Sequence, residues 1–160
     1  MELHSKLVAK LSEVYKDYEI WLESEVGIDY IVIVNPFGGE NIRISDEDGI
    51  IFFFSYHHAH FDYGVDIDDN IDCLVDYINS FLYERHVAIE FFHGDTNLFG
   101  GSRSLDDIDA SSGETLLKSF TGDNFSSLQK HFYEQLRGIN CHCSIRGWDI
   151  AYNKDIDFIL

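Results

Sequence analysis

A succession of short apolar segments separated by turn residues is the feature that most constrains the fold of this chain. Apolar runs and apolar–polar alternation predict strands over residues 29–35, 41–45, 50–61, 86–94, 97–102 and 139–148, with a short final strand at 157–160. Within the run at 139–148, Cys141 and Cys143 fall on one face, which we expect to be buried. Consecutive strands joined by short connections favour an antiparallel sheet.

Helical spacing of apolar residues alternates with these strands. We expect helices over residues 3–24, 66–84, 113–120 and 124–137. The 160 residues suit a single domain that spans residues 1–160. Together the patterns predict an α+β fold, in which a mainly antiparallel sheet has its helices packed on one face. The other face of the sheet is then available to carry the function.

Charge narrows the classes of partner. The chain has 29 acidic and 11 basic residues, a formal net charge of −18. Binding to nucleic acid requires clustered Lys and Arg, and an anionic membrane surface repels an acidic protein, so we expect neither partner. A negative surface instead favours encounter with a basic protein.

Cysteine usage and the first residues bear on location. Three cysteines, an odd number, are typical of reduced thiols in a reducing compartment. Residues 1–22 contain no continuous apolar segment of the kind that a secretion signal needs, and no apolar run is long enough to span a bilayer. We therefore expect a cytoplasmic protein without a membrane segment.

A histidine-rich segment offers the strongest chemical candidate. His58, His60 and Asp62 alternate along a predicted strand and would share one face. Two imidazoles and a carboxylate are ligands that zinc and similar ions accept. The alternative is that these are polar residues on a half-exposed strand. The sequence contains neither a glycine-rich nucleotide motif nor another motif for a cofactor, and we expect no cofactor.

Other candidate contact residues are acidic or aromatic. Asp66, Asp68 and Asp69 begin a predicted helix, where negative charge is favoured, and they would also supply charge toward a cationic partner. Tyr56 and Trp148 are candidate aromatic anchors for an interface. For Trp148 the alternative is a side chain at the edge of the core.

Two blocks of the sequence carry a resemblance. They are the segment FFFSYHHAHFDYG with the acidic helix and strand that follow it, and the Trp-containing strand near the C-terminus. Residues 28–93 and 139–150 resemble small acidic bacterial proteins of uncharacterised activity, which in turn resemble immunity partners of polymorphic or contact-delivered toxins. The matching positions are His58, His60, Phe61, Asp62, Trp148 and Asp149. The resemblance implies binding to a toxin domain and carries over no catalytic residue.

Three hypotheses follow. The first is a non-enzymatic immunity-type protein that binds and neutralises a basic toxin or effector domain through Tyr56, His58, His60, Asp62, Asp66, Asp68, Asp69 and Trp148. The second is a metal-dependent enzyme that uses His58, His60 and Asp62. The third is a module that binds a small molecule or peptide on an aromatic sheet face.

Overall fold

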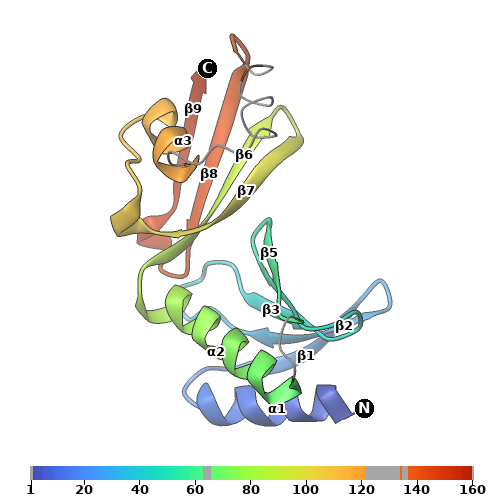
Figure 1. The fold of residues 1–160 in the computed structure, drawn as a ribbon. Helices are drawn as coiled ribbons and strands as arrows, with labels where there is room; N and C mark the ends of the chain where they lie inside the picture. The colour runs from blue at the N-terminus through green and yellow to red at the C-terminus, as the bar shows by residue number, and fades with distance from the viewer. Residues whose placement is uncertain (1, 63–65, 122–133, 135–136, 160) are drawn as a thin grey trace.

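The first half of the chain forms a five-stranded antiparallel sheet with two helices (Figure 1). The computed structural model describes residues 2–62, 66–121, 134 and 137–159. The strand order follows the sequence, β1-β2-β3-β4-β5. The elements are α1 (Glu2–Val14), β1 (Ile20–Glu25), β2 (Ile28–Ile33), β3 (Ile42–Ser45), β4 (Ile51–Phe54), β5 (His57–His60) and α2 (Ile67–Tyr83).

The second half forms a four-stranded antiparallel sheet with one described helix (Figure 1). Its strand order is β7-β6-β8-β9, and single-turn helices lie at Leu105–Asp107 and Ile150–Tyr152. The elements are β6 (His86–His93), β7 (Thr96–Ser104), α3 (Gly113–Thr121), β8 (Asn140–Gly147) and β9 (Lys154–Ile159). The predicted α+β class with antiparallel strands is confirmed, and the strands divide between two sheets.

Each sheet buries one face under helices. In the five-stranded sheet, apolar residues of β2, β3 and β4 pack against α1 and α2 in a core that includes Ile31, Ile44 and Phe52. In the four-stranded sheet, α3 packs on β6 and β8 around Phe91 and Cys143. As predicted, Cys141 and Cys143 lie on a buried face. The period-two alternation of each strand assigns the remaining side chains to the opposite face.

The predicted helix over residues 3–24 is wrong after Val14. The chain turns at residues 15–18 and enters β1, which pairs with β2 through a two-residue turn at Val26 and Gly27. Both turn residues have positive φ, 55° and 85°, as a type I′ hairpin requires. The buried hydroxyl of Tyr15 donates a hydrogen bond to the carbonyl of Val75 (3.1 Å), which joins the end of α1 to α2.

The predicted single strand over residues 50–61 is a hairpin. β4 ends at Phe54 and β5 begins at His57, with Ser55 and Tyr56 forming the turn. Ser55 takes a positive φ of 56° without being glycine, so the sequence carries no ordinary turn signal here. The predicted helix over 124–137 lies outside the described residues, apart from positions 134 and 137. None of the described helices is long and apolar enough to cross a membrane.

Trp148 lies in the core and is only 2% exposed, so its predicted role as a surface anchor is wrong for this structure. Alternation over residues 139–148 predicts Trp148 on the face that carries Arg146, opposite Cys141 and Cys143. At the end of β8, however, that face meets the core of the five-stranded sheet, where the indole contacts the rings of Phe54 and Tyr18. Trp148 therefore connects the two sheets by packing at the end of β8 into the core of the five-stranded sheet.

We predict that Trp148→Ala lowers the free energy of unfolding by about 3–5 kcal/mol, because it removes a large buried side chain that joins both sheets. The matched control is Trp21→Ala, which truncates the other tryptophan, whose exposed fraction is 45%. The control should cost about 1 kcal/mol or less. Urea unfolding of the two variants measures both values, and equal losses would contradict this placement of Trp148.

Candidate functional site

The five-stranded sheet presents a face that none of the described helices covers (Figure 1). Cross-strand pairing aligns two rows of side chains on this face. The first row mixes aromatic, apolar and charged residues, and the second ends at His60. The first row is Trp21, Val32, Arg43, Phe53 and His58. The second row is Glu23, Tyr30, Ser45, Ile51 and His60.

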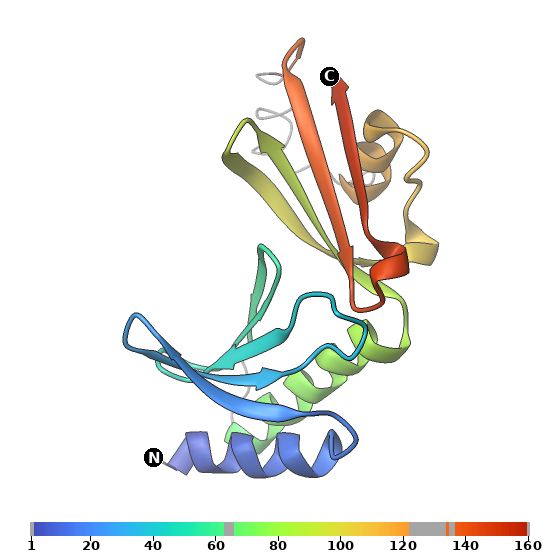
Figure 2. The same cartoon turned by 180° about the vertical axis from the view of Figure 1, so that it is seen from behind.

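The four-stranded sheet also has an uncovered face among the described residues, seen from the front in Figure 2. On β6 this face carries Glu90 and Phe92, which alternate with the core residues Ile89 and Phe91. On β8 it carries three polar residues: His142, Ser144 and Arg146. They alternate with Cys141, Cys143 and Ile145, which face the core. Unlike the helix-covered face, this surface is therefore rich in polar and titratable groups.

The β4–β5 hairpin separates two hollows, one on each open face. A hollow of about 380 Å³ lies on the five-stranded sheet, lined by Tyr30, Arg43, Phe53 and Ser55 among others. A second hollow of about 330 Å³ lies on the four-stranded sheet and includes Tyr56 and Phe92. The adjacent turn residues Ser55 and Tyr56 thus face different hollows. We call the two hollows and the hairpin tip between them the corner.

Carboxylates outnumber cations when the corner is taken together with the side chains that pair with its arginines. Arg43 forms ion pairs with Glu23 and Glu25, both at 2.8 Å. On the other sheet, one terminal nitrogen of Arg146 contacts both carboxylate oxygens of Asp155, at 2.8 and 3.0 Å. Further carboxylates line the two hollows at Glu40 and Asp95. Each arginine is therefore already neutralised, and the surface keeps an excess of negative charge.

A partly buried polar network lies beneath the hairpin, where the sheets meet. His57 Nε2 hydrogen bonds to the Tyr77 hydroxyl (2.7 Å), which shares a second hydrogen bond with Ser102 Oγ (2.6 Å). His57 Nδ1 lies 3.9 Å from Glu90 Oε1, and Asn97 donates to Glu90 Oε2 (2.9 Å). These residues come from β5, α2, β7, β6 and the start of β7, so the network links both sheets.

Burial controls the protonation of this network. It lowers the pKa of His57 to about 4, with a smaller contribution from the neighbouring His58. Burial raises the pKa of Glu90, which the hydrogen bond from Asn97 partly opposes. Burial also raises the pKa of Tyr77. At neutral pH the network therefore contains a neutral imidazole, a neutral phenol and a carboxyl group that ionises less readily than usual.

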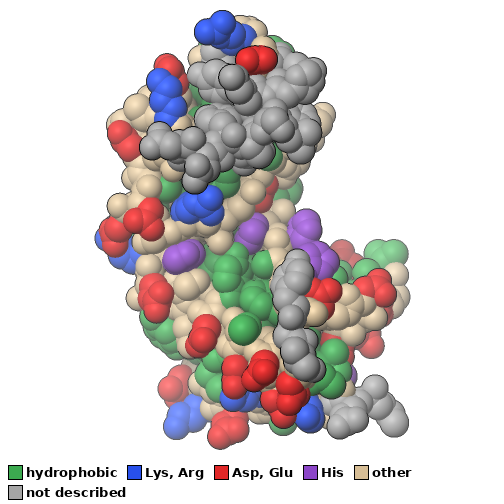
Figure 3. All heavy atoms as spheres, viewed as in Figure 1, with side chains coloured by type: hydrophobic (Ala, Val, Ile, Leu, Met, Phe, Trp, Pro, Cys, Tyr) green, Lys and Arg blue, Asp and Glu red, His purple; other side chains and the backbone are tan. Residues whose placement is uncertain are grey.

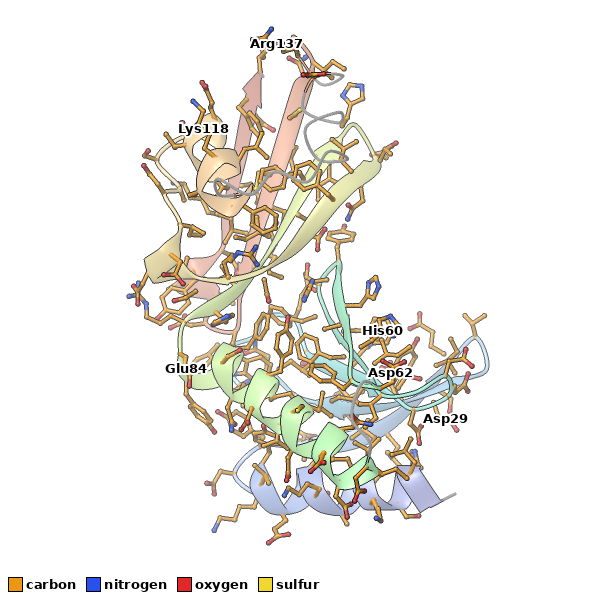
Figure 4. All side chains as sticks on the ribbon, viewed as in Figure 1. Asp29, His60, Asp62, Glu84, Lys118 and Arg137 are labelled. Atoms are coloured by element: carbon orange, nitrogen blue, oxygen red, sulfur yellow. The ribbon has the colours of Figure 1, made fainter. Side chains whose placement is uncertain are left out.

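His58 and His60 do share one face, as predicted, with their ring centroids 5.4 Å apart. Both are exposed, and Figure 4 shows His60 with Asp62, which is also exposed, close to it in the view. Within the described part of the chain, however, no group of three or more His, Cys, Asp and Glu side chains is placed to hold a metal ion. The described structure therefore does not assemble the predicted three-ligand cluster.

The predicted acidic residues of α2 have local partners. Asp66 caps the helix by accepting from the backbone N–H of Asp68 (3.1 Å), and Asp68 pairs with Lys6 of α1 (3.0 Å). Asp69 is exposed in the first turn. Acidic side chains gather over α1 and α2, at the bottom of the view, and histidines gather where the sheets meet (Figure 3).

Tyr56, a predicted aromatic anchor, is 66% exposed and packs edge-on against Phe92, with ring centroids 5.2 Å apart.

Sequence reasoning missed most of the corner and of the polar network beneath it. Glu90 had a usable signal, because it is a lone carboxylate inside the apolar run VAIEFF. A side chain at Gly100 would occupy the space of the Glu90 carboxylate, so that glycine accommodates the buried acid. Ser102 had no such signal, since its role depends on contact with Tyr77 of α2. Ser144 and Arg146 had none either, because β8 pairs with β6, a strand distant in sequence.

Comparison with known proteins adds no functional information. No family model matches the sequence, and no significant match is found among curated proteins or solved structures. Functional inference therefore rests on the geometry and charge of the corner.

The lowered pKa of His57 predicts acid sensitivity. The unfolded chain binds a proton at His57 near pH 6.5, whereas the folded chain resists it until about pH 4. The stability that neutral His57 contributes is therefore complete above pH 6.5 and is lost as the pH falls toward 4. Between pH 7.5 and 5.5 this loss is about 1 kcal/mol.

Urea unfolding at pH 7.5 and 5.5 tests this prediction in the wild type and in His57→Gln. The variant should lose about 1 kcal/mol less than the wild type over this interval. Glu90 acts in the opposite direction, because its raised pKa makes its ionisation costly, and the cost decreases as the pH falls. Identical pH dependence in wild type and His57→Gln would refute the assignment.

Proposed function

We propose that this protein is a non-catalytic binding protein whose corner covers part of a basic protein domain. The observation that supports the proposal is the meeting of two sheet faces that no described helix covers and that combine exposed aromatic rings with excess carboxylates. Aromatic residues dominate the energy of protein interfaces, and charge complementarity accelerates encounter and selects partners. In keeping with the resemblance of the sequence to immunity proteins, we propose a toxin or effector domain as the partner.

Shape and charge both support this reading. The two hollows, of about 380 and 330 Å³, can each receive a protruding side chain or loop. Trp21, Phe53 and Tyr56 provide apolar contact area on or beside these surfaces. The arginines in the corner are paired, so a cationic partner meets little uncompensated positive charge.

Apart from the buried Trp148, the residues predicted from the sequence divide between two roles in this proposal. Tyr56, His58 and His60 lie in or beside the corner and form part of the contact surface. Asp62, Asp66, Asp68 and Asp69 lie nearer the start of α2 and contribute long-range attraction rather than direct contact. Long-range attraction is screened by salt, which makes association slower at high ionic strength.

We predict that removing charge from the corner weakens binding to the partner. The test variant is Glu40→Gln/Asp95→Asn, and the control is Glu13→Gln/Asp17→Asn, with the same change in net charge on the side of α1. A partner is first captured from host extract with the wild-type protein and identified by mass spectrometry. It is then purified, and its Kd is measured by calorimetry at 50 and 300 mM salt.

The expected partner is rich in Lys and Arg and binds at least about tenfold more weakly to the corner variant than to the control. Its Kd should also weaken with salt for the wild type. In co-expression, the wild type should relieve growth inhibition by the partner, and the corner variant should relieve it less. An acidic partner, or equal affinities for both variants, would exclude this function for the corner.

A further inference from the structure

We propose that the hollow on the four-stranded sheet is a subsite for one arginine side chain of the partner. This inference rests on the proposed function and deepens it, because it names the group that the corner recognises. The subsite consists of Tyr56 from the hairpin, Phe92 and Asp95 from β6 and the turn that follows it, and His142, Ser144 and Arg146 from β8.

Three rings form one wall of the subsite. Phe92 lies between Tyr56 and His142, with ring centroids 5.2 and 6.2 Å away. Tyr56 is inclined at 74° to Phe92 and His142 at 46°, so the rings present faces and edges at different angles around one space. A planar guanidinium stacks on aromatic faces and gains cation–π attraction there.

The charge of the subsite also favours a cation. Asp95 lines the hollow, and Asp155 and Asp157 lie beside it, bonded to Arg146 and His142. Arg146 supplies one positive charge against these three carboxylates. Its other terminal nitrogen donates to the backbone carbonyls of residues 145 and 154, so both terminal nitrogens of Arg146 are hydrogen bonded within the sheet.

Ser144 is the second, independent observation that points to a ligand. Ser144 is 4% exposed and lines the hollow, and its Oγ has no hydrogen-bond partner among the described residues. A buried polar atom without a partner costs about 1–3 kcal/mol. The hydroxyl at the floor of an aromatic and acidic hollow would gain a partner by accepting a hydrogen bond from an incoming guanidinium N–H. An apolar side chain offers the hydroxyl no partner, and an anionic side chain, which could accept from it, is repelled by the carboxylates around the hollow.

The test is a titration of the full-length protein with N-acetyl-arginine amide, followed by two-dimensional amide NMR. The matched neutral probe is N-acetyl-citrulline amide, which has nearly the same shape without the charge. We expect shifts at the amides of Phe92, Gly94 and Ser144 with the arginine probe, and at least about tenfold weaker binding of the citrulline probe. Equal binding of both probes would overturn the proposal.

Variants locate the contacts. Tyr56→Ala removes an exposed ring and Asp95→Asn removes an exposed charge. Each should raise the Kd of the arginine probe about tenfold. Ser144→Ala removes the hydroxyl with little change of volume and should raise the Kd of the arginine probe several-fold. The control, Asp29→Asn, removes a carboxylate on β2 and should leave binding unchanged. Unchanged binding in both Tyr56→Ala and Asp95→Asn would refute the subsite, and unchanged binding in Ser144→Ala would refute the role of its hydroxyl.

The outcome is separable from that of the proposed function. If a basic partner binds at the corner but Tyr56→Ala, Asp95→Asn and Ser144→Ala all leave its Kd unchanged, the arginine subsite is wrong and the binding function stands. If the arginine probe binds as expected but no basic protein binds the corner, the subsite stands without the partner proposed for it.

Discussion

The packing of Trp148 against the five-stranded sheet is the contact on which the rest of the architecture depends. Trp148 follows β8 of one sheet and is buried in the core of the other, beside Phe54. Its carbonyl oxygen also accepts a hydrogen bond from the side chain of Asn35 (2.8 Å), a buried residue in the loop after β2. Because indole and carbonyl are held by the same neighbouring sheet, the two sheets are fixed at one angle, and their open faces meet.

The network under the hairpin depends on this arrangement. Tyr77 of α2 belongs to the first sheet's helix layer, whereas Ser102 and Glu90 belong to the second sheet. The hydrogen bond between Tyr77 and Ser102 and the approach of His57 to Glu90 therefore depend on how the two sheets meet. Burial of a carboxyl group disfavours its ionised form, so burying Glu90 lowers the stability of the folded protein when the carboxyl group is ionised. Perturbed groups of this kind concentrate at functional surfaces, which fits their position beside both hollows.

The sequence predicted local structure well where local pattern decides it. The strands containing Ile44, Ile89 and Cys143 were found from apolar runs and alternation, and the helix over residues 66–84 from its apolar stripe and acidic start. Prediction failed where two periods fit the same residues. From Val14 to Leu22 the apolar spacing suits a helix, yet the chain forms β1, because the positive φ angles at Val26 and Gly27 direct a hairpin with β2.

The candidate site was less predictable for a different reason. Alternation predicts Trp148 on the Arg146 side of its strand, but exposure depends on what packs against that side, and the pattern along one strand does not contain this information. The same limitation applies to Ser144. It is a small polar residue between Cys143 and Ile145 in the sequence, and only pairing with Glu90 on β6 and Asp155 on β9 places it at the floor of a hollow.

Net charge alone also underdetermines the binding surface. Carboxylates occur along most of the chain, and several serve the fold itself: Asp66 caps α2, while Asp68 and Asp72 join α2 to the lysines of α1. What distinguishes the corner is that its carboxylates stand beside exposed aromatic rings on a surface that no described helix covers. Solvated acidic residues on a helix attract a cationic partner from a distance, whereas rings and carboxylates around a hollow select a particular side chain. The specificity of the protein is therefore expected from the corner, and its association rate from the overall charge.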